Sequence, residues 1–306
     1  MRWRAVLALL ATLAPAACAQ HAAPPSDQAA YAYDDTKHLV ALVDDAAASI
    51  RADGLAASCA RFAKKGSRWY FGQYYLFVYG LDGTTVCHAA SPSLVGKNLM
   101  GMRDINGKPI VREITDIGKE PQADASGWVF YLWQEQSQLG PSWKSAYVRK
   151  VETGGRTYVV GSGLYQMRIE QAWVRQRVDE AARLLRTKGE KVAFRAFQDP
   201  ASPFVFSDTF VFVLDAQGKT LVDPAFPTMA GRNLAAFRDA VGNQPVASAL
   251  EALRTSDAVW MQYLWPSSSG SPARKLIYIR KVVVDGRPLY VGTDFFLATP
   301  IWMKAG

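Results

Sequence analysis

The amino-acid sequence predicts an α+β protein made of two tandem copies of one module, each a long helix followed by an antiparallel β-sheet. Stretches with apolar residues at helical spacing alternate with short aromatic and β-branched runs bounded by Gly, Pro and Ser. The same order of motifs also occurs twice. At 306 residues, with 49% hydrophobic and 20% charged residues, the chain has the length and composition for two folded modules, which excludes a disordered protein.

The first 19 residues are expected to be an export signal. Arg2 and Arg4 give a basic start, and residues 5–14 form an apolar run that is too short to span a bilayer. Cleavage after residue 19 gives a soluble periplasmic or secreted protein. Two alternatives stay open, namely a lipoprotein cut before Cys18 and an uncleaved anchor.

The formal charge of the chain is +8, and it falls to +6 without the two arginines of the signal. Basic and acidic residues are interspersed, and no stretch is a basic run. Nucleic-acid binding needs clustered cations, so we expect no nucleic-acid partner. A mild attraction for small anions is the better use of this charge.

Residues 20–33 are rich in Ala, Pro and Ser and are expected to be a flexible leader. A helix is predicted from Asp34 or Asp35, with a carboxylate as its N-cap, past Gly54 to about residue 64. Strands are then predicted at 74–80 and 85–89, joined by an Asp-Gly turn. The chain continues with a loop and short helix at 91–118, three strands within 127–165, and a helix at about 166–188 that Gly189 interrupts or ends.

The second copy repeats the first at an offset of 135 residues, which falls to 132 and then 131. A shared pattern of this length indicates an internal duplication at the scale of a domain. Matched pairs include Gly54/Gly189, Phe77/Phe212, Gly83/Gly218, Arg103/Arg238, Trp128/Trp260, Tyr131/Tyr263, Trp133/Trp265, Lys144/Lys275 and Tyr147/Tyr278.

The repeat also bears on the two cysteines that follow the signal. Cys59 aligns with Phe194 and Cys87 with Val222, so both cysteines replace apolar residues and are expected to be buried. Because export permits disulfides, we hypothesise a Cys59–Cys87 bridge between helix and sheet. Two separate buried thiols are the alternative.

The sequence contains little that predicts catalysis. There are three histidines, none with a partner at metal-ligand spacing, and there is no nucleophile motif, phosphate loop or dinucleotide fingerprint. Asp104 lies in a turn, where carboxylates more often shape the loop than act as bases. We therefore expect a non-enzyme without metal or cofactor, with catalysis by His88 or Asp104 as an alternative.

Aromatic and basic residues on the sheet predict a binding site instead. Tyr131 and Trp133 share one strand face, whereas Lys144 and Tyr147 lie on opposite faces of the next strand unless a bulge intervenes. Cations and hydroxyls suit a carboxylate, and the rings suit a short apolar tail. The alternative is an aromatic core with solvated cations. The candidate ligand-binding residues are Arg103, Tyr131, Trp133, Lys144 and Tyr147, with Tyr263 and Trp265 in the second copy.

The order of motifs resembles the Cache superfamily, most closely its small-Cache type. These motifs are Gly-[Lys/Arg]-Asn-Leu, Arg-Asp-x-x-Gly, Trp-x-x-Tyr-x-Trp, Lys-x-x-Tyr-[Val/Ile]-Arg-Lys and Gly-Ser-Gly-x-Tyr, within residues 34–296. The resemblance implies PAS-like sheets backed by a long N-terminal helix, in modules at 34–165 and 166–300. It also implies extracytoplasmic binding of a small carboxylate, such as acetate, propionate, lactate or pyruvate, or of an amino-acid-like metabolite.

The sequence departs from that family in two respects. Cache sensors are usually bracketed by transmembrane helices and followed by a signalling module, and neither is visible here. We therefore expect a separate membrane receptor or sensor kinase as partner. Asp294 also stands where the first copy has Gly163, and it would disfavour an anionic ligand if it faced the pocket. The first copy is thus the expected binder, and an envelope structural or interaction protein without ligand is the alternative.

Overall fold

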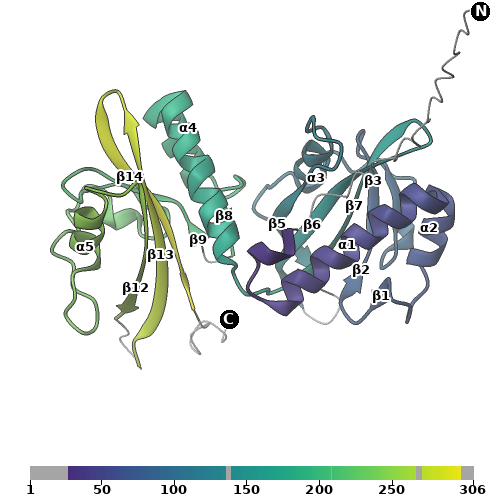
Figure 1. Cartoon of the computed structure of the whole chain (residues 1–306), viewed down its shortest axis with the longest axis horizontal. Helices are drawn as coiled ribbons and strands as arrows, with labels where there is room; N and C mark the ends of the chain where they lie inside the picture. Colours follow the sequence, from purple (N-terminus) through teal and green to yellow (C-terminus); the bar gives the residue numbers. More distant parts are fainter. Residues whose placement is uncertain (1–26, 136–138, 208, 267–270, 298–306) are drawn as a thin grey trace, which may run out of the picture.

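The computed structural model describes residues 27–135, 139–207, 209–266 and 271–297. The export signal expected at 1–19, Cys18 and the start of the leader lie outside these residues. Two five-stranded antiparallel sheets, each with helices, form two modules that lie side by side (Figure 1). The predicted α+β architecture is confirmed. None of the helices in the described ranges combines the length and apolarity needed to cross a membrane.

The first module runs from α1 to β7, and its main sheet has the order β4-β3-β7-β6-β5. A two-stranded ribbon, β1 with β2, lies beside it. The element bounds are α1 Asp34–Asp53, α2 Leu55–Phe62, β1 Tyr70–Phe71, β2 Tyr74–Tyr75, β3 Phe77–Gly80, β4 Thr85–His88, α3 Ile110–Gly118, β5 Ser126–Gln134, β6 Pro141–Thr153 and β7 Arg156–Tyr165, with short 3₁₀ turns η1 (Asp27–Ala30) and η2 (Pro92–Leu94).

The second module repeats this plan with the sheet order β11-β10-β14-β13-β12. Its ribbon pairs β8 with β9. The bounds are α4 Gln171–Gln198, β8 Val205–Phe206, β9 Thr209–Phe210, β10 Phe212–Leu214, β11 Thr220–Val222, η3 Pro227–Met229, α5 Pro245–Ala252, β12 Ala258–Trp265, β13 Ala273–Val284 and β14 Arg287–Phe296.

Both long helices break at the glycines that the repeat aligns. Gly54 has φ 80° and separates α1 from α2, and Gly189 has φ 74° within α4, a backbone region that glycine tolerates best. The start of each helix differs from expectation. The N-cap of α1 is Tyr33, so Asp34 and its neighbour lie in the first turn, where carboxylates favour the helix dipole.

The predicted start of the second helix at 166 is wrong, because α4 begins at Gln171. Gln166 has φ 50°, which is outside helical geometry. The buried Glu170 precedes the helix and accepts hydrogen bonds from the backbone N–H groups of Ala32 and Tyr33, at 2.8 and 3.0 Å. One carboxylate therefore joins the start of α1 to the start of α4.

Each sheet has one face under a long helix and the other under a short one. In the first module, apolar residues of α1 such as Leu39 and Val43 pack on Trp128, Phe130 and Tyr147. The opposite face, which carries Tyr131, Val129 and Val148, packs on α3. Alternation along the strands therefore separates a structural face from a second face, which is covered only in part by α3 and by loops.

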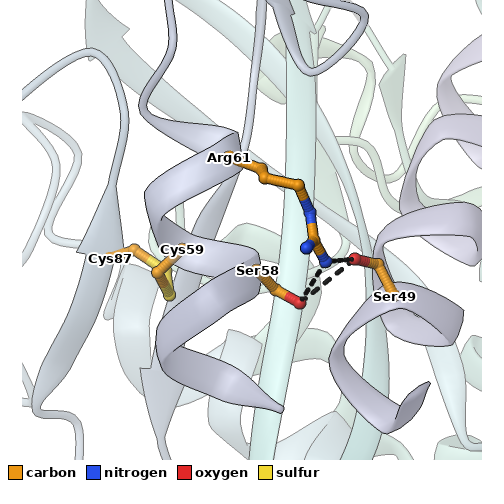
Figure 2. The surroundings of a disulfide bond; sticks show 5 residues. All are labelled: Ser49, Ser58, Cys59, Arg61 and Cys87. Carbon is orange, nitrogen blue, oxygen red and sulfur yellow. Dashed lines mark hydrogen bonds between the residues drawn. A yellow bond between two sulfur atoms is a disulfide. The ribbon is translucent and has the colours of Figure 1, made fainter. Parts of the chain in front are cut away.

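A disulfide joins Cys59 of α2 to Cys87 of β4, with 5.8 Å between the Cα atoms (Figure 2). On the same helix, Arg61 donates hydrogen bonds to the hydroxyls of Ser49 and Ser58 and links α2 to α1. The second module has Phe194 and Val222 at the equivalent positions, where apolar packing replaces the covalent link.

The modules contact each other through β8 and α4. Phe206 stacks on Phe130 at 4.5 Å between ring centroids, and Trp173 lies 4.6 Å from Trp128. The buried Lys108 donates a hydrogen bond to the carbonyl oxygen of Val205 at 2.8 Å. In Figure 1, α4 lies on the side of the second sheet that faces the first module. The contact thus combines aromatic packing with hydrogen bonds made by the buried side chains of Lys108 and, at the start of α4, of Glu170.

Candidate functional site

The sheet of the first module places three predicted residues on its α3 side. Tyr131 of β5 pairs with Lys144 of β6, which pairs in turn with Tyr165 of β7. Trp133 follows two residues after Tyr131 on the same face, and the two rings are 6.0 Å apart. This half of the sheet therefore carries three aromatic side chains around one lysine.

Lys144 is the buried centre of this group, with 1% of its surface exposed. Its Nζ donates a hydrogen bond to the hydroxyl of Tyr75, and it lies 4.0 Å from the ring centroid of Tyr75 and 5.2 Å from that of Tyr165. In the described part of the chain no carboxylate forms an ion pair with it. Burial lowers the pKa of the Lys144 ammonium to about 7, because its charged form is poorly solvated there.

A cavity of about 510 Å³ opens over this lysine. Tyr75 and Tyr165 line it and cover Lys144, so the ammonium lies behind their hydroxyls and is not itself in the wall. The Tyr75 hydroxyl also forms a hydrogen bond with the Tyr165 hydroxyl, which in turn donates to the backbone carbonyl oxygen of Gln134 at 3.0 Å. The lining is Tyr70, Gly72, Gln73, Tyr75, Ala90, Ser91, Ser93, Leu94, Met102, Trp133, Gln134, Glu135 and Tyr165.

His88 lies beside this cavity as a neutral acceptor. Its Nδ1 accepts a hydrogen bond from the backbone N–H of Ser91 at 3.0 Å, and its ring packs 5.3 Å from that of Tyr75. Burial and the nearby charge of Lys144 lower the pKa of His88 to about 4. The histidine therefore holds the loop after β4 without adding charge.

Two of the predicted residues do not join the site. Tyr147 lies on the opposite face of β6, in the core under α1, as strict alternation from Lys144 requires. Arg103 is exposed and donates a hydrogen bond to the carbonyl oxygen of Gly107 at 2.7 Å. The adjacent Asp104 accepts N–H groups of Asn106, Lys108 and Leu132, so the Arg-Asp-x-x-Gly motif shapes a loop.

The second module has a cavity of about 380 Å³ at the equivalent place. Tyr263 and Trp265 line it as predicted residues, together with Lys275. Lys275 forms an ion pair with Asp294, with 2.9 Å between Nζ and Oδ1, and Tyr263 donates its hydroxyl proton to Asp294 Oδ2 at 2.5 Å. The lysine that both modules share is therefore neutralised within the chain only in the second module.

Several lining residues were missed by the sequence reasoning. Tyr75 and Tyr165 align with Phe210 and Phe296, so comparison of the two copies gives no sign that their hydroxyls are important. Lys275 was detectable, since it aligns with Lys144. In the described ranges no group of three His, Cys, Asp or Glu residues is placed to hold a metal ion.

Comparison with known proteins identifies a family. A family model described as "Cache domain" matches residues 57–297, which is most of the chain. Among curated proteins, the methyl-accepting chemotaxis protein McpP of Pseudomonas putida is 26% identical over 102 residues, covering 33% of this chain and 18% of the relative. The match thus spans less than a fifth of that relative's length.

Solved structures resemble the chain more distantly. A Cache chemosensory domain, solved to explain carboxylic acid recognition, has a TM-score of 0.34 and 15% identity, covering 41% of this chain and 91% of its own. The ligand-binding domain of the Pseudomonas fluorescens chemoreceptor CtaA, solved with L-alanine, has a TM-score of 0.29 and 13% identity, covering 84% of this chain and 87% of its own. The family assignment depends on the family model and not on these scores.

Proposed function

The chain belongs to the Cache domain family, and from this premise we propose that it is an exported, non-catalytic sensor protein whose first module binds a short carboxylate. The module bounds at 34–165 and 166–300, and a membrane receptor or sensor kinase as partner, are parts of the same proposal. A role in sensing is supported by the curated relative, which is a methyl-accepting chemotaxis protein.

One observation supports the ligand class above all, the buried Lys144 without a carboxylate. A buried charge is costly unless it is paired, and the chain leaves this one to the hydroxyl and rings of two tyrosines. An anion in the cavity would replace the Gln134 carbonyl oxygen as the acceptor of the Tyr165 hydroxyl proton, with the positive charge of Lys144 directly behind the two tyrosine hydroxyls. Trp133 offers an apolar surface for a short hydrocarbon tail.

Calorimetric titration of the purified chain tests this proposal. Acetate, propionate, lactate and pyruvate are titrated into the wild type and into Lys144→Met, which keeps the volume of the side chain but removes its charge. We expect at least one acid to bind the wild type and to lose at least tenfold in affinity in the variant.

The matched control is Lys150→Met, on the same strand. Lys150 is also buried, but it pairs with Glu152 and donates to the carbonyl oxygen of Glu120, away from the cavity lining. Equal losses in both variants would contradict the assigned role of Lys144. Failure of every acid to bind would favour the alternative of an envelope interaction protein without ligand.

Export is tested separately. Fractionation of cells that express the full chain, with mass spectrometry of the mature N-terminus, is expected to find the protein outside the cytoplasm and to start at Gln20. A lipid-modified Cys18 would establish the lipoprotein alternative.

A further inference from the structure

The cavity of the second module differs from that of the first in its charge. Its wall is mostly aromatic and aliphatic, including Phe212, Phe226, Phe237 and Trp265. One basic and two acidic side chains interrupt this wall, namely Lys275, Asp294 and Asp223. One cation and two carboxylates therefore line the same cavity.

Asp294 removes Lys275 as a receptor for an external anion. One of its oxygens is paired with Lys275 Nζ and the other accepts the hydroxyl proton of Tyr263. The protein's own carboxylate thus supplies the counterion that Lys144 of the first module lacks in the described part of the chain. A further anion in this cavity would meet two carboxylates and no uncommitted cation.

Asp223 brings the second carboxylate, which the ion pair does not neutralise. Its Oδ1 accepts the backbone N–H of Phe226 at 3.0 Å, and no ion pair with it occurs in the part of the chain that the structure describes. Burial raises the pKa of Asp223, and the charge of Asp294 raises it further, whereas Lys275 lowers it.

The fold itself does not need this charge. His88 occupies the equivalent position of the first module and accepts the N–H of Ser91, again three residues later, while uncharged. A neutral side chain thus fills the same structural role. The carboxylate of Asp223 is therefore an addition specific to the second cavity, next to the rings of Phe226 and Trp265, which stack at 5.1 Å.

We propose that the second cavity binds a small organic cation, a primary amine on a short apolar body, with its ammonium at Asp223 and its body against the aromatic wall. The ammonium supplies the missing positive charge, and aromatic faces attract cations as well as hydrocarbon. A volume of about 380 Å³ is within the range of small-molecule sites. The proposal does not depend on carboxylate binding in the first module.

The test compares three probes of similar size on the full chain, n-butylammonium, n-butyrate and n-butanol. Calorimetric titration is carried out in the Lys144→Met background, so that the first module does not contribute an anion signal. We expect butylammonium to bind at least tenfold more tightly than either other probe. Either of two outcomes would overturn the proposal. Equal binding of butanol would mean that the cavity selects only for an apolar body, and tighter binding of butyrate would mean that it prefers an anion.

Substitutions of Asp223 test whether its carboxylate binds the ammonium group of the probe. Asp223→Asn keeps an oxygen for the Phe226 N–H, and Asp223→His copies the first module; both are expected to weaken butylammonium at least tenfold. Asp215→Asn is the matched control, because Asp215 also caps a turn of this module, accepting the N–H groups of Gln217 and Lys219, outside the cavity lining. Unchanged binding in both Asp223 variants, or an equal loss in Asp215→Asn, would overturn the assignment.

Discussion

Asp294 of β14 forms an ion pair with Lys275 of β13, with 2.9 Å between Oδ1 and Nζ, at the position where the first module has Gly163. A Cβ atom on Gly163 would lie 2.8 Å from Cε of Lys144 and 2.9 Å from the carbonyl oxygen of Ser145. The first module thus leaves no room there for an internal carboxylate. Duplication kept the lysine in both sheets, and divergence gave it a counterion in only one.

Two substitutions are expected to invert the preference of the second cavity, from a cationic to an anionic ligand. Asp223→His together with Asp294→Gly places the residues of the first module at these two positions, so Lys275 would lack a carboxylate in the cavity wall. Calorimetric titration in the Lys144→Met background is expected to show butyrate binding more tightly than butylammonium. A retained preference for the amine would show that the aromatic wall, and not charge, determines selectivity.

Carboxylate binding to the first module is expected to depend on pH. The free protein holds Lys144 with a pKa of about 7, and a bound anion favours the charged form. Binding therefore takes up a proton above pH 7, and affinity falls by up to about tenfold per pH unit there, while it levels off between about pH 5 and 7. Titration in buffers of different ionisation enthalpy measures the proton uptake. Binding that is independent of pH from 6 to 9 would contradict the role of Lys144.

The architecture was predictable because it depends on periodicity and repetition. Strand alternation correctly separated Lys144 from Tyr147, and Gly189 was correctly predicted to interrupt the second helix. The first helix was predicted to continue past Gly54, whereas α1 ends there. The cavity composition was less predictable. Tyr75 reaches Lys144 from a ribbon 69 residues away, a contact that no local pattern encodes.

The prediction of Arg103 as a ligand contact came from its guanidinium and its place before a turn. Arg103 and Arg238 each donate to the carbonyl oxygen of the glycine four residues later, at 2.7 and 2.9 Å. Both arginines therefore stabilise a loop that the two modules share. Residues that differ between the copies, such as His88 and Asp223, carry more information about binding than residues that match.

Lys144→Met is expected to stabilise the ligand-free protein. The unfolded chain holds the lysine proton up to a pH of about 10.5, whereas the folded chain loses it near pH 7. The wild type therefore gains stability as pH rises through this window, by up to about 1.4 kcal/mol per pH unit from this group. Methionine does not titrate, so this pH dependence of the unfolding free energy is lost in the variant. Because methionine also buries no charge, the unfolding free energy at pH 7 is expected to rise by about 1–3 kcal/mol.

Urea unfolding from pH 6 to 10 measures this effect. Lys150→Met is the control, and it is expected to lower stability because it breaks the hydrogen bond to Glu120. The expectation would be contradicted if Lys144→Met were less stable than the wild type at pH 7 and its unfolding free energy changed with pH as in the wild type. The folded protein would then stabilise the charged ammonium of Lys144 well enough to offset its burial.

Removal of the Cys59–Cys87 disulfide is expected to destabilise the first module selectively. The bridge closes a loop with a sequence separation of 28, for which loop entropy predicts a loss of about 3–4 kcal/mol on removal. Cys59→Phe with Cys87→Val copies the aligned residues of the second module, and Cys59→Ala with Cys87→Ala is the plain removal. In scanning calorimetry, addition of reductant is expected to lower the melting temperature of the wild type, and to leave that of either variant unchanged. Two free thiols in the unfolded, unreduced protein would contradict the bridge, and equal destabilisation of both modules would indicate that the α4 contact makes them unfold together.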